Sequence, residues 1–248
     1  MPTTTETRHE IAEVGLRAAP SWLSERLADG SHADAVRAFE LARETFIEGR
    51  RIDMGALATR LGVDRTSLFR WVGNRDALLS EVLWSLAVPT LVLSEHATEQ
   101  LHGPERVAEQ LSSFAGALIS ADYFRDFLRR EPARALRLLT TTESEIQRRY
   151  VATARWLVVR ELGERPLDGA ISPDELAYLL VRVSESFTYA DLIAGDTPSE
   201  ARARRAFRIL LRADLAVEPG AEPGAAPDTG SGAGSDAGPD ATAGASAS

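Results

Sequence analysis

The sequence predicts an all-α fold, and three observations support this class. Apolar residues recur at spacings of three and four from Ala33 to Leu215, which is the period of a helix face. Prolines and glycines separate these stripes at intervals that suit helices. Alternating apolar and polar runs, which are typical of half-buried strands, are missing. We therefore expect helices joined by turns through this part of the chain.

The two ends of the chain differ from this central part. Residues 1–32 are an N-terminal extension that we expect to be partly disordered, loose over residues 1–7 and broken at Pro20 into short helical pieces between Ile11 and Leu27. Residues 217–248 contain five acidic residues, no basic residue and almost no apolar side chain larger than alanine. Such a segment cannot bury enough surface to offset the entropy of ordering, so we expect a disordered acidic low-complexity tail.

Several helices are expected between these ends. One stripe contains Val36, Phe39 and Phe46, and others follow at residues 107–118, 146–158 and 176–187. The breakers are Pro89, Gly103-Pro104, Pro132, residues 163–166, Ser172-Pro173 and residues 195–198. Ser172 and Glu175 form a capping-box pattern around a proline at the first helical position, which predicts a helix start. The last two long helices are expected at about residues 173–194 and 198–211.

The stretch from Gly49 to Leu79 predicts a helix-turn-helix motif. Asp53 can cap a short helix whose apolar side begins at Met54, and Gly62 can take the left-handed conformation that ends it. Asp64 can cap a second helix over residues 65–72, with Leu68 and Val72 facing inward. Two short helices joined by a glycine turn are typical of DNA-binding proteins, in which the second helix enters the major groove. Residues 73–74 then break the chain, and we expect a longer helix over residues 74–88.

Charge distribution agrees with a DNA-binding segment. The whole chain has a formal charge of −9, but residues 49–75 contain six arginines and only two acidic residues. A local positive patch can bind a phosphate backbone on an otherwise acidic protein. A solvated helix face is the alternative explanation for the arginines alone. The caps, the turn and the spacing together favour DNA contact through Arg65, Thr66, Ser67 and Arg70.

The sequence from Met54 to Leu79, MGALATRLGVDRTSLFRWVGNRDALL, resembles the DNA-binding signature of the TetR family of transcriptional regulators. With the preceding helix, the resemblance covers about 50 residues. It implies that Arg65, Ser67, Phe69, Arg70 and Trp71 contact bases or phosphates, and that Arg75 contacts phosphate at the next helix start. Phe69 and Trp71 depart from the family's usual tyrosine and its usual histidine or tyrosine.

The resemblance also implies a domain organisation and a set of partners. Residues 33–88 would form a three-helix helix-turn-helix domain, and residues 89–216 a larger helical effector-binding and dimerisation domain. The expected partners are palindromic double-stranded operator DNA, a small-molecule effector and a second copy of the chain. We expect the last two long helices to supply a four-helix dimer seam, through Leu176, Leu180, Val183, Phe187, Phe207 and Leu211.

The rest of the chain has a second resemblance. Residues 127–140, FLRREPARALRLLT, and residues 190–195, ADLIAG, are similar to QsdR-type regulators of quorum-signal lactone degradation within this family. That similarity implies an acyl or γ-lactone effector. Aromatic residues are the candidates for lining an effector cavity, although such residues more often form plain core. The candidate lining residues are Phe114, Tyr123, Phe127, Trp156, Tyr178, Phe187 and Tyr189.

Other function classes have little support in the sequence. There is no cysteine, which fits a reducing cytoplasm, and no continuous apolar run long enough to span a membrane. Glycine-rich phosphate loops, nucleophile elbows and zinc-protease motifs are absent, so we expect no enzyme and no cofactor. Glu99 and His102 have helical metal-ligand spacing, but there is no second copy, and we expect no metal.

The predicted function is therefore a TetR-type DNA-binding regulator, a repressor released from its operator by a small apolar effector. One alternative keeps the DNA-binding domain and makes the C-terminal body a ligand-free module for dimerisation or protein docking. A more distant alternative is an all-helical enzyme. Repressor and activator roles are not distinguished by the sequence.

Overall fold

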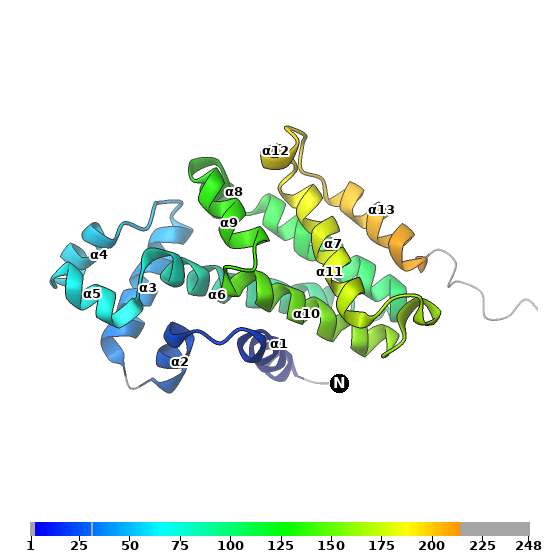
Figure 1. Cartoon of the computed structure of the whole chain (residues 1–248), viewed down its shortest axis with the longest axis horizontal. Helices are drawn as coiled ribbons and strands as arrows, with labels where there is room; N and C mark the ends of the chain where they lie inside the picture. Colours follow the sequence, from blue (N-terminus) through cyan, green and yellow to red (C-terminus); the bar gives the residue numbers. More distant parts are fainter. Residues whose placement is uncertain (1–2, 31, 214–248) are drawn as a thin grey trace, which may run out of the picture. The chain divides into compact units, whose positions relative to one another are not determined.

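The computed structural model describes residues 3–30 and 32–213, and the fold over these residues is all-α, as predicted (Figure 1). They form thirteen α-helices and one 3₁₀ turn, with no strand among them. The acidic tail at residues 217–248 lies outside the described residues, as do residues 1–2, 31 and 214–216.

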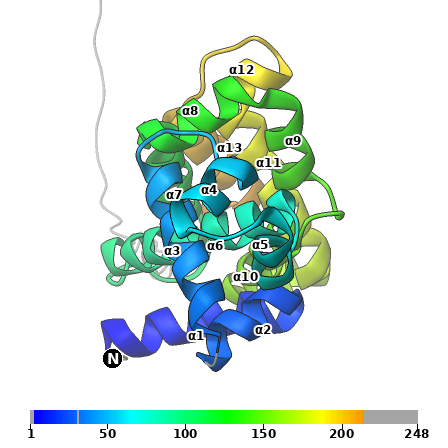
Figure 2. The same cartoon turned by 90° about the vertical axis from the view of Figure 1, so that its left-hand side faces the viewer.

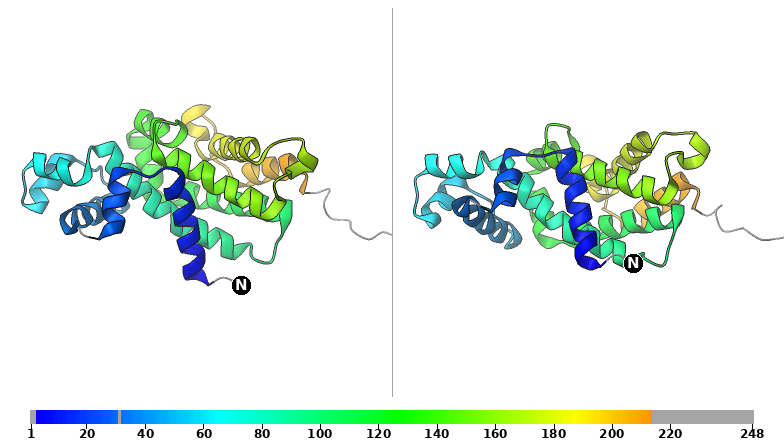
Figure 3. Two further views of the ribbon diagram at one scale, coloured as in Figure 1. Left: turned by 60° about the horizontal axis from the view of Figure 1, so that its bottom comes forward. Right: turned by 90° about the horizontal axis from the view of Figure 1, so that it is seen from below.

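Two helices precede the DNA-binding motif: α1 (Thr4–Ala18) and α2 (Trp22–Asp29), with the predicted break at Pro20 between them. The prediction of a loose segment over residues 1–7 is wrong from Thr4 onward. Thr3 and Glu6 form a capping box, and Thr7 is 2% exposed. Helix α1 packs across α6 and α10, whose bounds are given below (Figure 3).

Three helices form the head of the protein: α3 (Ala33–Ile47), α4 (Met54–Leu61) and α5 (Arg65–Val72) (Figure 2). The predicted helix-turn-helix is confirmed. Gly62 has φ 71°, the left-handed conformation that lets the chain turn sharply after α4. The inner sides of α4 and α5 are buried against α3 within one apolar cluster.

Helix α6 (Arg75–Ala97) runs from the head into the rest of the protein. The predicted end at Val88 is wrong, because the helix continues through Pro89. A proline there removes one backbone donor, and the burial of Val88, Leu91 and Val92 around it offsets that loss. By length and composition alone α6 could cross a membrane, but 61% of its most apolar stretch is buried inside the protein, which is typical of a core helix.

The remaining helices form the body. They are α7 (Gly103–Ser120), α8 (Asp122–Arg130), α9 (Pro132–Thr140), α10 (Glu145–Leu162), α11 (Pro173–Thr188), α12 (Ala190–Ile193) and α13 (Glu200–Leu211), with the 3₁₀ turn at Pro166–Gly169. The capping box predicted at Ser172 and Glu175 is present at the start of α11. Helix α13 packs along α7, and α11 packs against α10.

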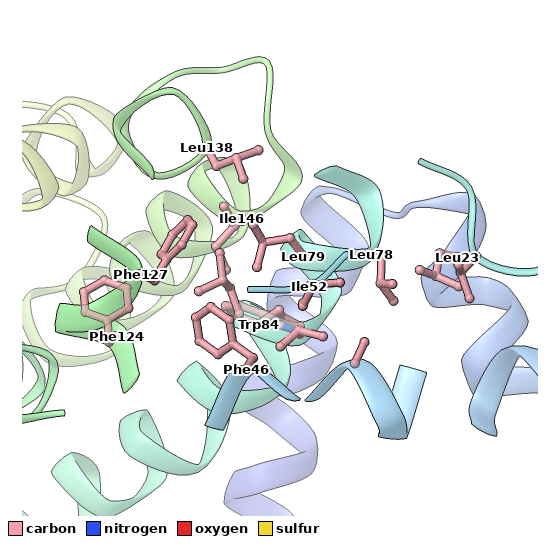
Figure 4. Close-up of a cluster of buried hydrophobic side chains, with 14 of the residues drawn as sticks. Leu23, Phe46, Ile52, Leu78, Leu79, Trp84, Phe124, Phe127, Leu138 and Ile146 are labelled. Atoms are coloured by element: carbon pink, nitrogen blue, oxygen red, sulfur yellow. The ribbon is translucent and has the colours of Figure 1, made fainter. Parts of the chain in front are cut away.

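Two apolar clusters account for most of the core. The first runs from the head into the body and includes Phe46, Leu79, Trp84, Phe124 and Ile146 (Figure 4). Because side chains from both ends of α6 belong to it, the head and the body share one continuous core.

The second cluster lies among α7, α10, α11 and α13, and it corrects the predicted dimer seam. Leu176, Leu180, Phe207 and Leu211 are fully buried within the single chain, while Val183 and Phe187 pack against their cluster. These stripes do follow the helical period, but they face the protein's own core. Other side chains of α11 and α13 must form any seam between subunits.

A buried ion pair joins the N-terminal helices to the body. The guanidinium of Arg149 on α10 donates to both carboxylate oxygens of Glu81 on α6, at 2.9 and 2.8 Å, and to the carbonyl oxygen of Ala19 at 3.0 Å. Ser21 donates to the same carboxylate at 2.6 Å. Arg149 is 0% exposed and Glu81 is 5% exposed, so each charge depends on the other.

Candidate nucleic-acid interface and ligand cavity

Helix α5 is built to present its outer face to solvent. Its first turn is capped by Asp64, whose carboxylate accepts from the backbone N–H of Ser67 at 2.9 Å and from the Ser67 hydroxyl at 2.7 Å. These hydrogen bonds, the side-chain one first, lower the pKa of Asp64. Leu68 and Val72 are fully buried on the inner face, which fixes the rotation of the helix.

The predicted DNA contacts on α5 divide by exposure. Arg65, Thr66, Phe69 and Arg70 are exposed, and the Arg65 guanidinium lies over the Phe69 ring at 5.5 Å from its centroid. Among the described residues, neither Arg65 nor Arg70 has an ion-pair partner. Ser67 is partly exposed with its hydroxyl engaged by the cap, and Trp71 is partly buried against the apolar cluster of the head. Four of the six predicted positions on this helix are therefore exposed, and three of these, Arg65, Thr66 and Arg70, carry side-chain hydrogen-bond donors.

Arg75, the seventh predicted contact, has intramolecular partners in this structure. Its guanidinium donates to both carboxylate oxygens of Glu131 at 2.6 and 2.5 Å, and its Nε donates to the carbonyl oxygen of Ile52. The hydrogen bond from Arg75 is the main reason why the pKa of Glu131 is lowered. Arg75 is 13% exposed, so a phosphate contact there would compete with Glu131.

Further ion pairs surround this contact. Asp76 pairs with Arg134 and Arg137 of α9, and Arg134 also lies 3.2 Å from Glu131. We call the group of Arg75, Asp76, Glu131, Arg134 and Arg137 the α6–α9 ionic contact. It joins the start of α6, next to the recognition helix, to the α8–α9 turn of the body.

A groove runs beside the recognition helix at this point. It is lined by Arg51, Arg65, Arg75 and Arg134, together with Phe69 and Asn74. Arg75 and Arg134 are paired with Glu131 and Asp76, so Arg51 and Arg65 supply most of the excess positive charge along this groove, next to Asp53. An acidic polymer backbone is the partner that this charge favours.

A mainly apolar cavity of about 50 Å³ lies in the body, against the part of α6 that contains Leu83 and Trp84. Its walls come from α6, α7, α8, α9 and α10 together with Tyr189, so almost every body helix next to α6 contributes. Three predicted lining residues, Phe114, Tyr123 and Tyr189, line this cavity. Trp84, Phe124 and Ile146 form further parts of its wall, and Figure 4 shows these three side chains on separate helices.

The other four predicted lining residues lie elsewhere. Phe127 packs edge-on against Phe46 and lines a small hollow next to the head. Trp156 donates from Nε1 to Glu10 at 3.1 Å, and Phe187 packs on the second apolar cluster beneath Arg202. Tyr178 is 52% exposed and lines a surface groove. Aromatic identity alone does not tell cavity wall from core, because both are apolar surroundings.

Two polar lining residues on α10 were missed by sequence reasoning. Gln147 and Tyr150 both line the cavity, and Tyr150 donates from its hydroxyl to Ser184 at 3.2 Å. Burial is the main reason why the pKa values of Tyr150 and Tyr189 are raised. The available signal was a glutamine next to the apolar stripe of residues 146–158, one helical turn before Tyr150.

Among the described residues, no group of three or more histidine, cysteine or acidic side chains is placed to hold a metal ion. Glu95, near the Glu99 and His102 pair, is 6% exposed and lies 2.6 Å from Arg160 and 3.7 Å from Arg106. This acidic side chain therefore belongs to an ion-pair network that joins α6, α7 and α10.

Comparison with known proteins agrees with this geometry. Residues 102–212 match the family described as the tetracyclin repressor-like C-terminal domain. Among solved structures, the chain is similar to the transcriptional repressor QsdR of R. erythropolis, from the TetR family, with 28% sequence identity and a TM-score of 0.62. The match covers 73% of this chain and 96% of that one. No curated protein matches the chain.

The helix-turn-helix head, the family match over the body and the likeness to a solved repressor lead to one conclusion. The chain is similar to the TetR family of transcriptional regulators, through its body at residues 102–212 and through its likeness to a solved member of that family.

Proposed function

We propose that this protein is a homodimeric transcriptional repressor of the cytoplasm that leaves its palindromic operator when a small apolar effector enters the body. The observation that carries the proposal is the recognition helix, which holds Arg65 and Arg70 on an exposed face without ion-pair partners among the described residues. Arginine is the side chain best suited to paired hydrogen bonds with guanine edges and to phosphate contacts. The full set of proposed DNA contacts is Arg65, Thr66, Ser67, Phe69, Arg70, Trp71 and Arg75.

The domain organisation follows from this role. Residues 33–88 would read DNA and residues 89–216 would hold the effector and the dimer contacts, with α6 belonging to both. In a dimer, two recognition helices would lie about 34–36 Å apart on successive major grooves of a palindrome. The exposed faces of α11 and α13 are the proposed seam, with Leu179 and Ile209 as its apolar side chains.

The effector is proposed to occupy the cavity that Trp84, Phe114 and Phe124 line. An acyl or γ-lactone is the favoured class, supported by the resemblance of residues 127–140 to QsdR-type regulators and by the likeness to a solved QsdR. Effector binding would move α6, because this helix supplies cavity wall at Leu83 and Trp84 and begins at the α6–α9 ionic contact. An inducer of this kind must bind the released form better by roughly 1–3 kcal/mol.

One alternative has an observation in its favour. A cavity of about 50 Å³ holds a few water molecules, well short of a typical ligand site. In this alternative the body is a ligand-free dimerisation or docking module, and the cavity is a packing defect. Saturable thermal stabilisation by a small molecule would exclude it, since a ligand that binds only the folded state raises Tm by mass action.

The DNA-binding part of the proposal has a direct test. Selection from random duplex DNA identifies a preferred site, and fluorescence anisotropy then measures its affinity for the full chain. We expect a palindromic site, and we expect Arg65→Ala and Arg70→Ala each to weaken binding about tenfold or more. Arg8→Ala on α1 removes the same charge from an exposed position far from α5, so it should leave the affinity unchanged. Equal affinity in all four proteins would refute the contact assignment.

A further inference from the structure

Gln147 has an unusual position for a polar side chain. It is 3% exposed on the inner side of α10 and lines the apolar cavity, and its amide interacts with the carboxylate of Glu185 and lowers the pKa of that group, but neither amide atom makes a hydrogen bond of normal geometry among the described residues. A buried amide whose hydrogen bonds are this incomplete is costly, and native proteins leave few of them unexplained. An amide that faces an empty apolar space is explained if a ligand supplies the missing partner.

The cavity contains no charged lining residue. Its wall is made of aliphatic and aromatic side chains, with the three tyrosines, Gln147 and the unpaired indole N–H of Trp84 as the polar exceptions. The nearest buried acid is Glu185, which lies beside Gln147 and is 5% exposed, with Oε1 lacking a hydrogen-bond partner. The guanidinium of Arg182 is already 3.1 Å from the other carboxylate oxygen of Glu185. An anionic ligand would lose its hydration here without gaining a free cation.

Gln147 also stands between the cavity and the surface. The same side chain lines a groove between α10 and α11, together with Val151, Tyr178 and Arg182. No other residue lines both the groove and the cavity. A ligand that moves from solvent through the groove into the cavity would therefore pass the Gln147 amide. The exposed Tyr178 gives the outer side of this route an aromatic face.

We infer that the cavity, which must widen from about 50 Å³ to admit a ligand, takes an uncharged carbonyl compound with an apolar tail, and that Gln147 is the residue that recognises its head group. The amide nitrogen donates to the carbonyl oxygen, and the tail lies against Phe114, Leu118 and Phe124. A carboxylate of the same chain length is excluded, because the site has no cation for it and a buried acid next to it. This inference rests on the proposed effector role of the cavity, and it adds the residue that recognises the head group and the exclusion of charged ligands.

The test compares two probes that differ in charge and share one carbon chain. Isothermal titration and thermal shift of the full chain use γ-octalactone and its ring-opened carboxylate, 4-hydroxyoctanoate. We expect saturable binding and a raised Tm with the lactone, and an affinity at least about tenfold weaker with the hydroxy acid.

Two glutamine variants separate the role of Gln147 from general core effects. Gln147→Leu removes the head-group contact, so it should weaken lactone binding about tenfold. Gln110→Leu is the matched control, because Gln110 is also 3% exposed with an unpaired amide oxygen but lies outside the cavity. It should bind the lactone like the wild type.

Three results would overturn the inference: equal or tighter binding of the hydroxy acid, no saturable binding of the lactone, or unchanged lactone affinity in Gln147→Leu. Failure of the proposed function is read separately, from DNA affinity of the same protein preparation. A chain that binds operator DNA but not the lactone refutes only the ligand class, whereas a chain that binds the lactone but no DNA refutes only the DNA-reading role.

Discussion

Ser67 illustrates how one side chain can have two competing roles on a recognition helix. The family pattern assigns it to DNA, but in this structure its hydroxyl donates to the Asp64 cap at 2.7 Å. The cap fixes the start of α5 and thereby orients Arg65 and Arg70, whose side chains stay free of ion pairs within the described part of the chain. Ser67 therefore contributes to DNA binding by positioning Arg65 and Arg70. A direct contact between its hydroxyl and DNA would require the hydrogen bond to Asp64 to be shared or broken.

Glu185 gives the protein a pH-dependent stability that can be measured. Burial raises its pKa from 4.5 to about 7, although Arg182 and Gln147 lower it. Between about pH 4.5 and pH 7, the folded state therefore keeps a proton on Glu185 that the unfolded state has released. The stability linked to this proton is fully present below about pH 4.5 and is lost as the pH rises through about 7.

Glu185→Gln removes this titration while keeping the shape of the side chain. We expect the free energy of unfolding of the variant, relative to wild type, to rise by roughly 3 kcal/mol between pH 4.5 and pH 8. Chemical denaturation across that range measures the difference. Glu175→Gln serves as the opposite control, because the Ser172 hydrogen bonds lower the pKa of Glu175 and its stabilising contribution is lost as the pH falls. A pH-independent difference for Glu185→Gln would contradict the expectation.

At the scale of helices, the local sequence predicts where a helix begins or ends wherever a capping residue or a turn determines that boundary. Asp53, Asp64 and Asn74 each accept from backbone N–H groups within three residues, so α4, α5 and α6 begin where the sequence predicts. Pro89 shows the limit of such signals. Its effect on α6 depends on burial by helices distant in sequence, and that burial overrides the local preference for a break.

The partners of charged residues depend on the same distant contacts. Arg75 and Glu131 are 56 residues apart, and nothing in the sequence around either one indicates the pair. Likewise, periodicity identified the apolar stripes of α11 and α13 but not whether they face the protein's own core or a second subunit. The helices were therefore more predictable than the surfaces they present.

The α6–α9 ionic contact leads to an expectation for DNA binding. Neutralising Glu131 leaves the charge of Arg75 uncompensated at the start of α6, where a helix N-terminus also favours phosphate. Glu131→Gln should therefore strengthen the proposed phosphate contact of Arg75, for which Glu131 competes in the wild type, and the slope of log affinity against log salt should steepen by up to about 0.9. Anisotropy titrations over a range of salt concentrations measure this slope.

Two variants control for this result. Glu143→Gln changes the net charge by the same amount at a side chain that is 72% exposed and 3.8 Å from Arg137, so the salt slope should stay at its wild-type value. Adding Arg75→Ala to Glu131→Gln should restore the wild-type slope. Equal steepening in Glu131→Gln and Glu143→Gln would show a general charge effect and would exclude Arg75 as the phosphate contact.

At the scale of the whole molecule, the described helices form one connected core. Helix α6 carries side chains of that core from the head to the cavity, and the Arg149–Glu81 pair joins α6 to α10 and to the α1–α2 junction. A change in the cavity therefore has a physical route to the recognition helix. The proposed palindromic operator would require a second recognition helix, so the proposal makes dimerisation the remaining condition for tight operator binding.

Two leucine-sized side chains allow a matched test of where the dimer forms. Ile209 on α13 and Leu93 on α6 are each 69% exposed, but only Ile209 lies on the proposed seam. Ile209→Glu places a charge in an apolar interface, so we expect a shift from dimer to monomer in analytical ultracentrifugation and a loss of operator affinity of about a hundredfold or more, because the two half-sites are no longer linked. Leu93→Glu should remain dimeric and bind DNA normally. If Leu93→Glu dissociates the dimer and Ile209→Glu does not, the seam lies along α6 and the two recognition helices must be spaced differently.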